Sequence, residues 1–354
     1  MAIDIKKLLQ SVVSHGASDL HLVARSEPQI RIDGTLKAVN LPVLTGEDIE
    51  EMTYALLTEK QKKSFEEHLE LDFALLLPGI GRFRANYYRT LGDIAAAFRI
   101  IPTEIPSLDD LNAPAIYKQL IKREKGLILI TGPTGSGKST TLAAMLNEIN
   151  LTEHKHIVTV EDPVEFIHQN KKCVFSHRET GSDTKGFAVA LKYAMRQDPD
   201  IILIGEMRDK ETIEAALTAA ETGHLVFGTL HTNSAPGTIN RIIDVFSGDE
   251  QGQIRTMIST SLVAVVAQML LPKKGGGRVA VPEIMTTNHA IANLIRENKV
   301  HQIASQMQLG QGESGMQTQT QVLVKLLKQN LITKEHAIQY ATKPDEVKRQ
   351  INFK

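Results

Sequence analysis

The sequence contains a single cysteine, no tryptophan and few aromatic residues. Phenylalanine, tryptophan and tyrosine together make up 5% of the 354 residues, so we expect a largely aliphatic core. The one thiol, Cys173, can form neither an internal disulfide nor a four-cysteine zinc site, which is consistent with a reducing compartment. The hydrophobic fraction of 42% is enough for a sizeable core, and the length favours two domains.

An excess of charge of either sign is also missing. Lys and Arg number 40, Asp and Glu number 41, and the formal net charge is -1. This balance argues against a surface that coats nucleic acid and against an acidic tail.

Long hydrophobic runs are absent as well. The longest, from Leu262 to Leu271, is about half of the ~20 residues that a membrane-spanning helix needs, and Gln268 interrupts it. Residues 1–16 have neither the apolar core nor the cleavage site of a signal peptide, and they predict a short amphipathic helix. We therefore expect a soluble, cytoplasmic protein that meets a membrane only through a partner.

The first hundred residues predict a small α+β domain. Strand patterns occur at 19–22, 29–32, 71–77 and 82–101, and helical periodicity occurs at 46–69. Asp33-Gly34 is a hairpin turn signal. Pro102 and Pro106 mark a linker, so we expect a domain at 1–100 and a linker at 101–118.

From Lys125 onward the pattern changes to continuous apolar runs separated by helical stretches. The runs lie at 126–130, 156–160, 201–204 and 225–229, and the helical stretches at 139–150, 184–197 and 209–222. This alternation predicts a doubly wound α/β core with a buried parallel sheet, at 119–271. We expect residues 272–354 to be mainly helical, with a flexible break at 273–277.

The strongest chemical signal is the stretch GPTGSGKS at 132–139, which matches the P-loop pattern. Glycines let backbone N–H groups curl around phosphate oxygens, and the following helix N-terminus favours negative charge. Lys138 would reach the β- and γ-phosphates, and the Ser139 hydroxyl would bind Mg²⁺. A chance glycine-rich turn is the alternative, which the preceding strand and following helix disfavour. The predicted nucleotide-binding residues are Gly132, Pro133, Thr134, Gly135, Ser136, Gly137, Lys138, Ser139 and Thr140.

Two carboxylates follow predicted strands of the same sheet. Glu206 follows the run at 201–204, and its extra methylene relative to aspartate suits a base aimed at the attacking water. Glu161 follows the run at 156–160 and is our candidate for a contact to Mg²⁺ or water. The alternatives are a helix-capping carboxylate for Glu206 and a solvated loop for Glu161.

Two histidines, His224 and His231, frame the apolar stretch 225–227. Their separation by seven residues is poor zinc spacing and places them on different faces or at different depths. A histidine near a strand end is more often structural. Here, however, the strand should neighbour the one that carries Glu206, so the segment 229–233 would reach the γ-phosphate side and could respond to that phosphate.

These four stretches, in this order, resemble the secretion ATPase superfamily of type II and type IV secretion and type IV pilus motors. They correspond to a Walker A (132–139), an Asp box (157–166), a Walker B (201–209) and a His box (222–232). The stretch 195–209 is similar to the family signature and departs from it only at Met195, where leucine is usual.

Three further stretches are similar to the retraction motors of type IV pili. They are 16–22, 290–297 and 315–318. In the second of them, Ala292 stands where these motors have an arginine. Extension motors usually carry an additional N-terminal region and a four-cysteine metal motif, for which this chain has no room.

The resemblance implies a homo-hexamer of chains with an N-terminal PAS-like domain and a RecA-like core, with ATP and Mg²⁺ between them. It assigns Glu206 as catalytic base and the His box, with His224 and His231, to nucleotide-dependent contacts. Arginines of the N-terminal domain would close the site, Arg82 and Arg99 first among the candidates Arg82, Arg84, Arg89 and Arg99. The amphipathic segment 286–300 would serve retraction, although packing on its own domain is the simpler interpretation.

The predicted function is therefore a hexameric ATP-hydrolysing motor that drives pilus retraction. It would act on an inner-membrane platform protein at the inner face of the cytoplasmic membrane and would bind no nucleic acid directly. Three alternatives remain open: an extension or type II secretion motor, a nucleic-acid translocase, and a nucleotide-gated scaffold without turnover. The near-neutral charge argues against the translocase.

Overall fold

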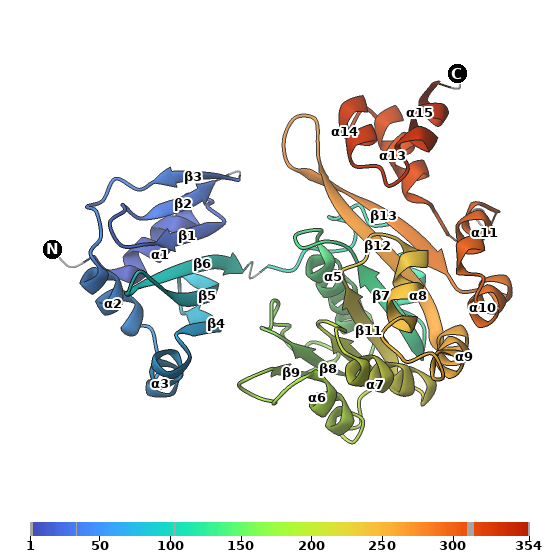
Figure 1. Ribbon diagram of the computed structural model, residues 1–354, viewed down its shortest axis with the longest axis horizontal. Coiled ribbons are helices and arrows are strands. Elements are labelled where there is room, and N and C mark those ends of the chain that lie inside the picture. The colour runs from blue at the N-terminus through green and yellow to red at the C-terminus, as the bar shows by residue number, and fades with distance from the viewer. Residues whose placement is uncertain (1–2, 33, 102–103, 310–314, 353–354) are drawn as a thin grey trace. The chain divides into compact units, whose positions relative to one another are not determined.

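The computed structural model describes residues 3–32, 34–101, 104–309 and 315–352, and it divides into two compact units (Figure 1). The first comprises Met1–Glu104 with Pro163–Ile167, and the second comprises Ile105–Asp162 with His168–Lys354. The positions Asp33 and Pro102, which we expected in a turn and a linker, lie outside the described residues. Within the described part of the chain, no helix has the length and apolar character needed to cross a bilayer.

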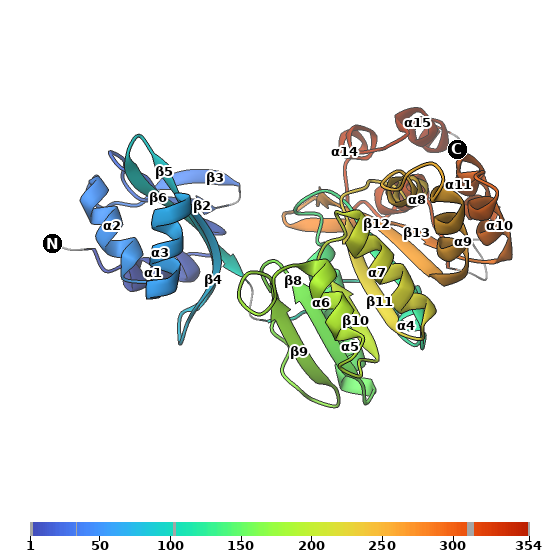
Figure 2. The same cartoon turned by 60° about the horizontal axis from the view of Figure 1, so that its bottom comes forward.

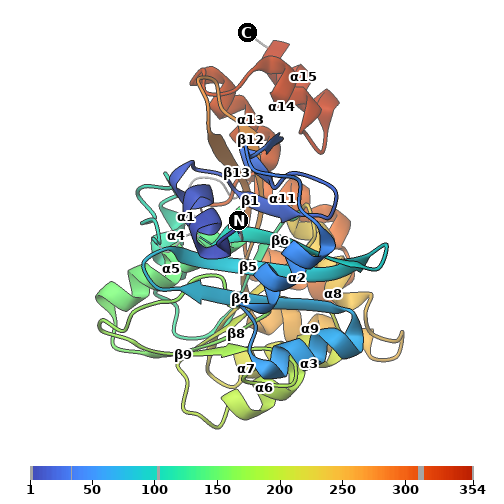
Figure 3. The same ribbon diagram turned by 90° about the vertical axis from the view of Figure 1, so that its left-hand side faces the viewer.

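The first unit is a six-stranded antiparallel sheet in the order β3-β2-β1-β6-β5-β4. The strands are β1 (Asp19–Leu22), β2 (Gln29–Ile32), β3 (Thr35–Ala38), β4 (Glu70–Leu77), β5 (Gly81–Thr90) and β6 (Asp93–Ile101). The helices are α1 (Ile5–Ser14), α2 (Gly46–Tyr54) and α3 (Glu59–His68). All three contribute to one apolar cluster with alternate residues of the sheet, so they cover a single face (Figure 3).

The segment 46–69, in which we found helical periodicity, forms two helices. Thr45 caps α2 through Asp48, and Thr58 caps α3 through Gln61, each in a capping box. A capping box satisfies the first backbone N–H groups of a new helix, so the second box starts a helix with its own axis. The apolar periodicity concealed this interruption.

The second unit contains a seven-stranded sheet in the order β13-β12-β7-β11-β10-β8-β9 (Figure 2). The strands are β7 (Gly126–Thr131), β8 (His156–Glu161), β9 (Val174–Glu179), β10 (Ile201–Ile204), β11 (Leu225–Leu230), β12 (Leu262–Pro272) and β13 (Arg278–Thr286). Every neighbouring pair is parallel except β12 with β13. The predicted α/β fold class is confirmed.

Helices cover both faces of this sheet. Leu127 and Leu129 of β7 join one apolar cluster, whereas Ile128 and Ile130 join the other. The first cluster includes α6 (Phe187–Ala194), α7 (Lys210–Glu221), α8 (Ala235–Ile243) and α9 (Gln251–Ser261), and the second includes α4 (Ile116–Leu120) and α5 (Lys138–Thr152). Because both faces of β7 are buried, the strand reads as an unbroken apolar run.

The region after residue 272 begins with a strand rather than a helix. β12 and β13 form an antiparallel hairpin, and the break at 273–277 is its turn, with three successive glycines at positive φ. Leu271 and Val281 of this hairpin pack against the C-terminal helices. These helices are α13 (Gln319–Lys328), α14 (Lys334–Gln339) and α15 (Pro344–Asn352), and they follow α10 (His289–Arg296), η1 (Val300–Gln302) and α11 (Ile303–Leu309).

Helix α10 lies within the amphipathic segment 286–300. Its residues Ile291 and Ile295 are fully buried in the same apolar cluster as α7 and α9, and Leu294 is partly buried against that cluster. Arg296 and Glu297 are exposed. The apolar face of α10 therefore packs on its own domain, which leaves the polar face available to solvent.

Candidate nucleotide-binding and catalytic site

The loop between β7 and α5 contains the P-loop residues, and two of its glycines are required by close packing. A Cβ on Gly132 would lie 2.1 Å from the carbonyl oxygen of Gln268 in β12, and one on Gly137 would lie 2.9 Å from the Nε2 atom of Gln268. Both glycines also have positive φ, 144° and 87°. A side chain at Gly132 would collide with the backbone of β12, and at Gly137 the left-handed backbone and the Gln268 amide both disfavour one.

Helix α5 begins with the donors that an anion needs. Its N-cap is Gly137, no side chain among the described residues caps its first N–H groups, and it runs for 15 residues. The Nζ atom of Lys138 donates hydrogen bonds to the carbonyl oxygens of Gly132 (2.8 Å) and Pro133 (3.2 Å), which holds the ammonium over the loop. Backbone donors, a helix N-terminus and a cation together favour a phosphate group.

The other P-loop residues differ in exposure. Ser136 is buried, and its Oγ has no hydrogen-bond partner within the described part of the chain. An unpartnered buried hydroxyl costs roughly 1–3 kcal/mol, so a ligand oxygen at this loop would stabilise it. Pro133, Thr134 and Gly135 are exposed, and Ser139 and Thr140 are partly exposed in the first turn of α5.

Glu161 and Glu206 lie at the carboxyl edge of the sheet. The P-loop, which directly follows β7, lies at the same edge. Glu161 ends β8, and β10 pairs with β8 up to the residue before Gly205. The backbone N–H of Gly205 donates to the carbonyl oxygen of Val160 (2.8 Å), and that of Met207 donates to Thr229 (3.0 Å). The segment that carries Glu206 is therefore fixed between β8 and β11.

The structure argues against the alternative role of each acid, a helix cap for Glu206 and a solvated loop for Glu161. Asp209 caps α7 by accepting a hydrogen bond from the backbone N–H of Thr212 (2.8 Å), so Glu206 is not the helix cap. Glu161 is buried at the end of β8, which differs from a solvated loop.

The carboxylate of Glu206 contacts His231 and Arg208. Its Oε1 atom lies 3.1 Å from Nε2 of His231 and 2.6 Å from Nε of Arg208, and the side chain is 19% exposed. His231 directly follows β11, the strand beside β10. The structure thus brings together the predicted base and one predicted histidine, and these two contacts fix the direction of the carboxylate.

His224 lies at the other end of β11. Its Nδ1 atom is 3.0 Å from the carbonyl oxygen of Ala219, and its own carbonyl oxygen accepts a hydrogen bond from Gly126 at the start of β7. The P-loop follows the other end of β7, which has six residues, so it begins roughly 20 Å from Gly126. The structure therefore does not bring His224 to the P-loop of its own chain, and its nucleotide contact stays a prediction.

A group of three threonine hydroxyls, which the sequence did not reveal, connects the P-loop strand to the His box. Thr131 immediately precedes the loop, and its Oγ1 lies 3.4 Å from Oγ1 of Thr238 in α8. Thr238 also contacts the hydroxyl of Thr232 (2.7 Å), one residue after His231. Only the polarity of Thr238 on the apolar face of α8 could have indicated this connection.

The four candidate arginines belong to the first unit, and strand alternation divides them. Arg82, Arg84 and Arg99 occupy the sheet face opposite the helices, because the residues between them fill the apolar cluster. Arg82 is buried and donates to the carbonyl oxygen of Glu165 (3.0 Å). Arg89 lies on the helix side, with its guanidinium 5.6 Å from the ring centre of Phe65. The contact of any of them with nucleotide stays a prediction.

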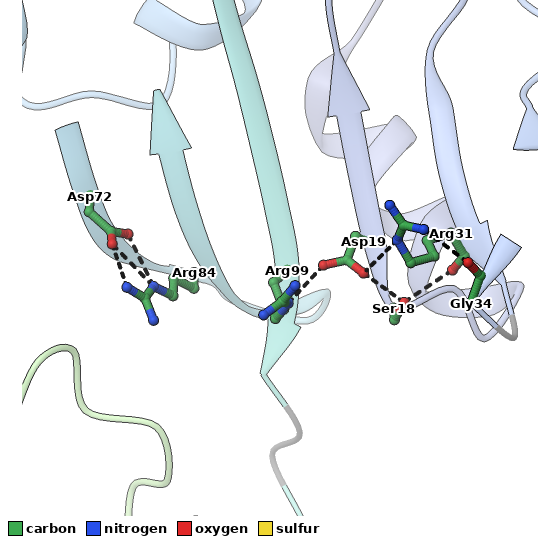
Figure 4. Close-up of polar contacts among 7 residues, drawn as sticks. All are labelled: Ser18, Asp19, Arg31, Gly34, Asp72, Arg84 and Arg99. Carbon is green, nitrogen blue, oxygen red and sulfur yellow. Dashed lines mark hydrogen bonds and ion pairs between the residues drawn. The ribbon is translucent and has the colours of Figure 1, made fainter. Parts of the chain in front are cut away.

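Arg84 and Arg99 are direct cross-strand neighbours, and each has a carboxylate partner (Figure 4). Arg84 contacts Asp72 through two nitrogens, and Nε of Arg99 lies 2.7 Å from Oδ1 of Asp19. Like charges opposite each other destabilise a sheet, and these carboxylates offset that repulsion. Burial acts to raise the pKa of Asp19, but the hydrogen bonds from Ser18 and Arg99 outweigh it and hold that pKa below 3.8.

We expect Asp19→Asn to lower the free energy of unfolding by about 1–3 kcal/mol at neutral pH, because it removes charge-assisted hydrogen bonds. A carboxylate whose pKa is lowered by folding stabilises the protein above its unfolded pKa, and the effect is lost as the pH falls through the folded value. The difference between wild type and variant should therefore be constant from pH 7 to near 5 and shrink below 3.8.

Calorimetric unfolding of the full chain across this pH range measures the difference. The matched control is Asp72→Asn, because the Asp72–Arg84 pair is exposed on the same sheet face. Such a pair contributes about 0–1 kcal/mol. Equal effects of the two substitutions would contradict the role assigned to Asp19.

A P-loop and two acids at the carboxyl edge of a parallel sheet define a P-loop nucleoside triphosphatase. Over residues 1–336 the chain matches the family described as type II/IV secretion system protein, and it belongs to that family. The family predicted from the four motifs is thus confirmed, and with it the ATPase class.

The chain is 50% identical over 342 residues to the type IV pilus retraction ATPase PilT of Pseudomonas aeruginosa, covering 97% of this chain and 99% of that protein. It is 49% identical to the twitching motility protein of Neisseria gonorrhoeae, covering 95% of this chain and 90% of the relative. A crystal structure of the pilus retraction motor PilT with bound ADP superposes with a TM-score of 0.91 at 48% identity, covering 98% of this chain and 99% of the other.

Proposed function

We propose that this ATPase is the motor that drives retraction of type IV pili. The observation that carries the proposal is the match to the retraction ATPase PilT over nearly the whole length of both chains. The geometry of the site supports the ATP hydrolysis that such a motor requires, because the P-loop, Glu161, Glu206 and His231 gather at one edge of the sheet.

In the proposed reaction, the P-loop N–H groups and Lys138 hold the triphosphate. Glu206 accepts the proton of the attacking water, and His231 with Arg208 keeps its carboxylate in place. The Ser139 hydroxyl and the Glu161 carboxylate are hard oxygen donors of the kind that Mg²⁺ prefers, so the donor set fits this ion. When bound, Mg²⁺ would offset the negative charge of the phosphate oxygens.

Six copies of the chain would form the working ring, and arginines of the first unit would contact the γ-phosphate in some nucleotide states. Arg82 and Arg99 are the first candidates. Hydrolysis would then be coupled to movement through an inner-membrane platform protein at the cytoplasmic side, with the exposed face of α10 contributing to that coupling.

Deletion of the gene, followed by return of the wild-type gene or the Glu206→Gln gene, tests the proposal. We expect deleted cells to keep surface pili that no longer retract, as seen in loss of twitching and by imaging labelled fibres. The wild-type gene should restore retraction, and the variant should not. Deleted cells without pili would instead indicate an extension motor, and DNA-stimulated hydrolysis with steep salt dependence would indicate a translocase.

A further inference from the structure

Gln268 is a polar residue in the middle of the otherwise apolar strand β12, and the residue is only 5% exposed. A buried amide is costly unless both its ends are hydrogen-bonded. Its Nε2 atom donates to the carbonyl oxygen of Ser136 (2.8 Å), and its Oε1 atom accepts from the hydroxyl of Thr141 (3.0 Å). The amide therefore connects β12 to the P-loop and to the first turn of α5.

Gln268 also sets the closest approach between β12 and the loop. Its carbonyl oxygen leaves no room for a side chain at Gly132, and its amide leaves little room at Gly137. Strand β12 thus packs against the loop at both Gly132 and Gly137. A hydrophobic residue at 268 could fill the same volume, but it could not hold a loop carbonyl.

The carbonyl that Gln268 holds determines where the next N–H group points. A trans peptide is planar, so the C=O of Ser136 and the N–H of Gly137 point in opposite directions. With the carbonyl directed at β12, the N–H of Gly137 is directed away from that strand. In the proposed nucleotide complex this is the side on which the loop surrounds a phosphate.

We propose that Gln268 is a positioning residue for nucleotide binding, which fixes the Ser136–Gly137 peptide so that its N–H group is ready to donate to a phosphate oxygen. The inference rests on the proposed role of the P-loop. Gln268 would thereby act on the peptide of Ser136, although the two residues are 132 positions apart in the sequence.

The first test replaces Gln268 by methionine, which is similar in size and removes both hydrogen bonds. We expect the KM for ATP to rise roughly tenfold, because the Ser136 carbonyl loses its partner, while kcat changes by less than about threefold. The matched control is Gln319→Met in α13, since Gln319 is equally buried and its amide contacts Thr342. The control should leave the KM unchanged.

The second test, Gln268→Glu, separates positioning from general loss of packing. A protonated carboxyl can donate to the Ser136 carbonyl as the amide does, whereas an ionised one repels it. Burial raises the pKa of such a carboxyl. The ATP affinity of the variant relative to wild type should therefore fall as the pH rises through that pKa.

Two ionisable groups near residue 268 are Lys138, which follows Gly137 at the start of α5, and Glu283, which is adjacent to Pro282, the β13 partner of Gln268. Glu283 pairs with Ala267 rather than with Gln268, so its side chain takes the opposite face of the hairpin. Both groups are common to wild type and variant, so the affinity ratio isolates the introduced carboxyl.

A KM for Gln268→Met equal to that of Gln319→Met, or an affinity ratio for Gln268→Glu that does not change with pH, would overturn the inference. Lys138→Ala distinguishes this failure from failure of the proposed function. If that variant loses ATP binding while the Gln268 variants keep it, only the inference fails. If Lys138→Ala binds ATP as wild type does, the nucleotide role of the loop fails.

Discussion

Lys138→Ala is expected to weaken ATP binding by roughly 30- to 4000-fold. Removing one partner of a desolvated charge pair costs about 2–5 kcal/mol, and each 1.4 kcal/mol is tenfold in Kd. The ammonium is held over the loop by the Gly132 and Pro133 carbonyl oxygens, so its place at the phosphates is set before binding. Titration with a fluorescent ATP analogue, together with phosphate release, measures the loss.

Lys192→Ala is the matched control, because Lys192 is an exposed lysine of α6 in the same unit. It should bind and hydrolyse ATP as wild type does. Lys138→Arg keeps the charge but changes the shape of the donor, so it should recover only part of the binding. Full turnover by Lys138→Ala would remove the P-loop from the proposed mechanism.

Glu206→Gln should bind ATP nearly as tightly as wild type and hydrolyse it 10²- to 10⁴-fold more slowly, the usual range for loss of a general base, about 3–5 kcal/mol in activation free energy. The amide keeps the size of the side chain but cannot accept a proton. Single-turnover hydrolysis at saturating ATP measures the chemical step, and equilibrium titration shows that binding is retained.

The control for this change is Glu214→Gln, on the exposed face of α7. It should leave kcat unchanged. An unchanged kcat for Glu206→Gln would leave Glu161, the other acid at this edge of the sheet, as the candidate base. The two carboxylates can then be compared by the same pair of measurements.

Features that depend on neighbouring residues could be predicted from the sequence. The P-loop pattern and the buried strand before it are local, and the structure places both as expected. β13 was not predicted because Pro282 interrupts its pattern. Proline is tolerated there since β13 is an edge strand of the sheet.

Contacts between distant parts of the chain could not be predicted in the same way. The sequence shows Gln268 only as an interruption of an apolar run, and its bonds to Ser136 and Thr141 require the β12–β7 pairing. Likewise, His224 and His231 look equivalent around one strand. Because strands in a parallel sheet share one direction, only the later histidine arrives at the carboxyl edge.

The pairing of Arg99 with Asp19 has a consequence for the proposed cycle. If Arg99 contacts a phosphate, that phosphate competes with a carboxylate of the protein itself for the same guanidinium. Such an exchange replaces one charge-assisted hydrogen bond by another, so it gains less free energy than a new contact made by an arginine without an anionic partner. Loss of the phosphate after hydrolysis would then return Arg99 to Asp19, so the guanidinium would have an anionic partner in both states of the proposed cycle.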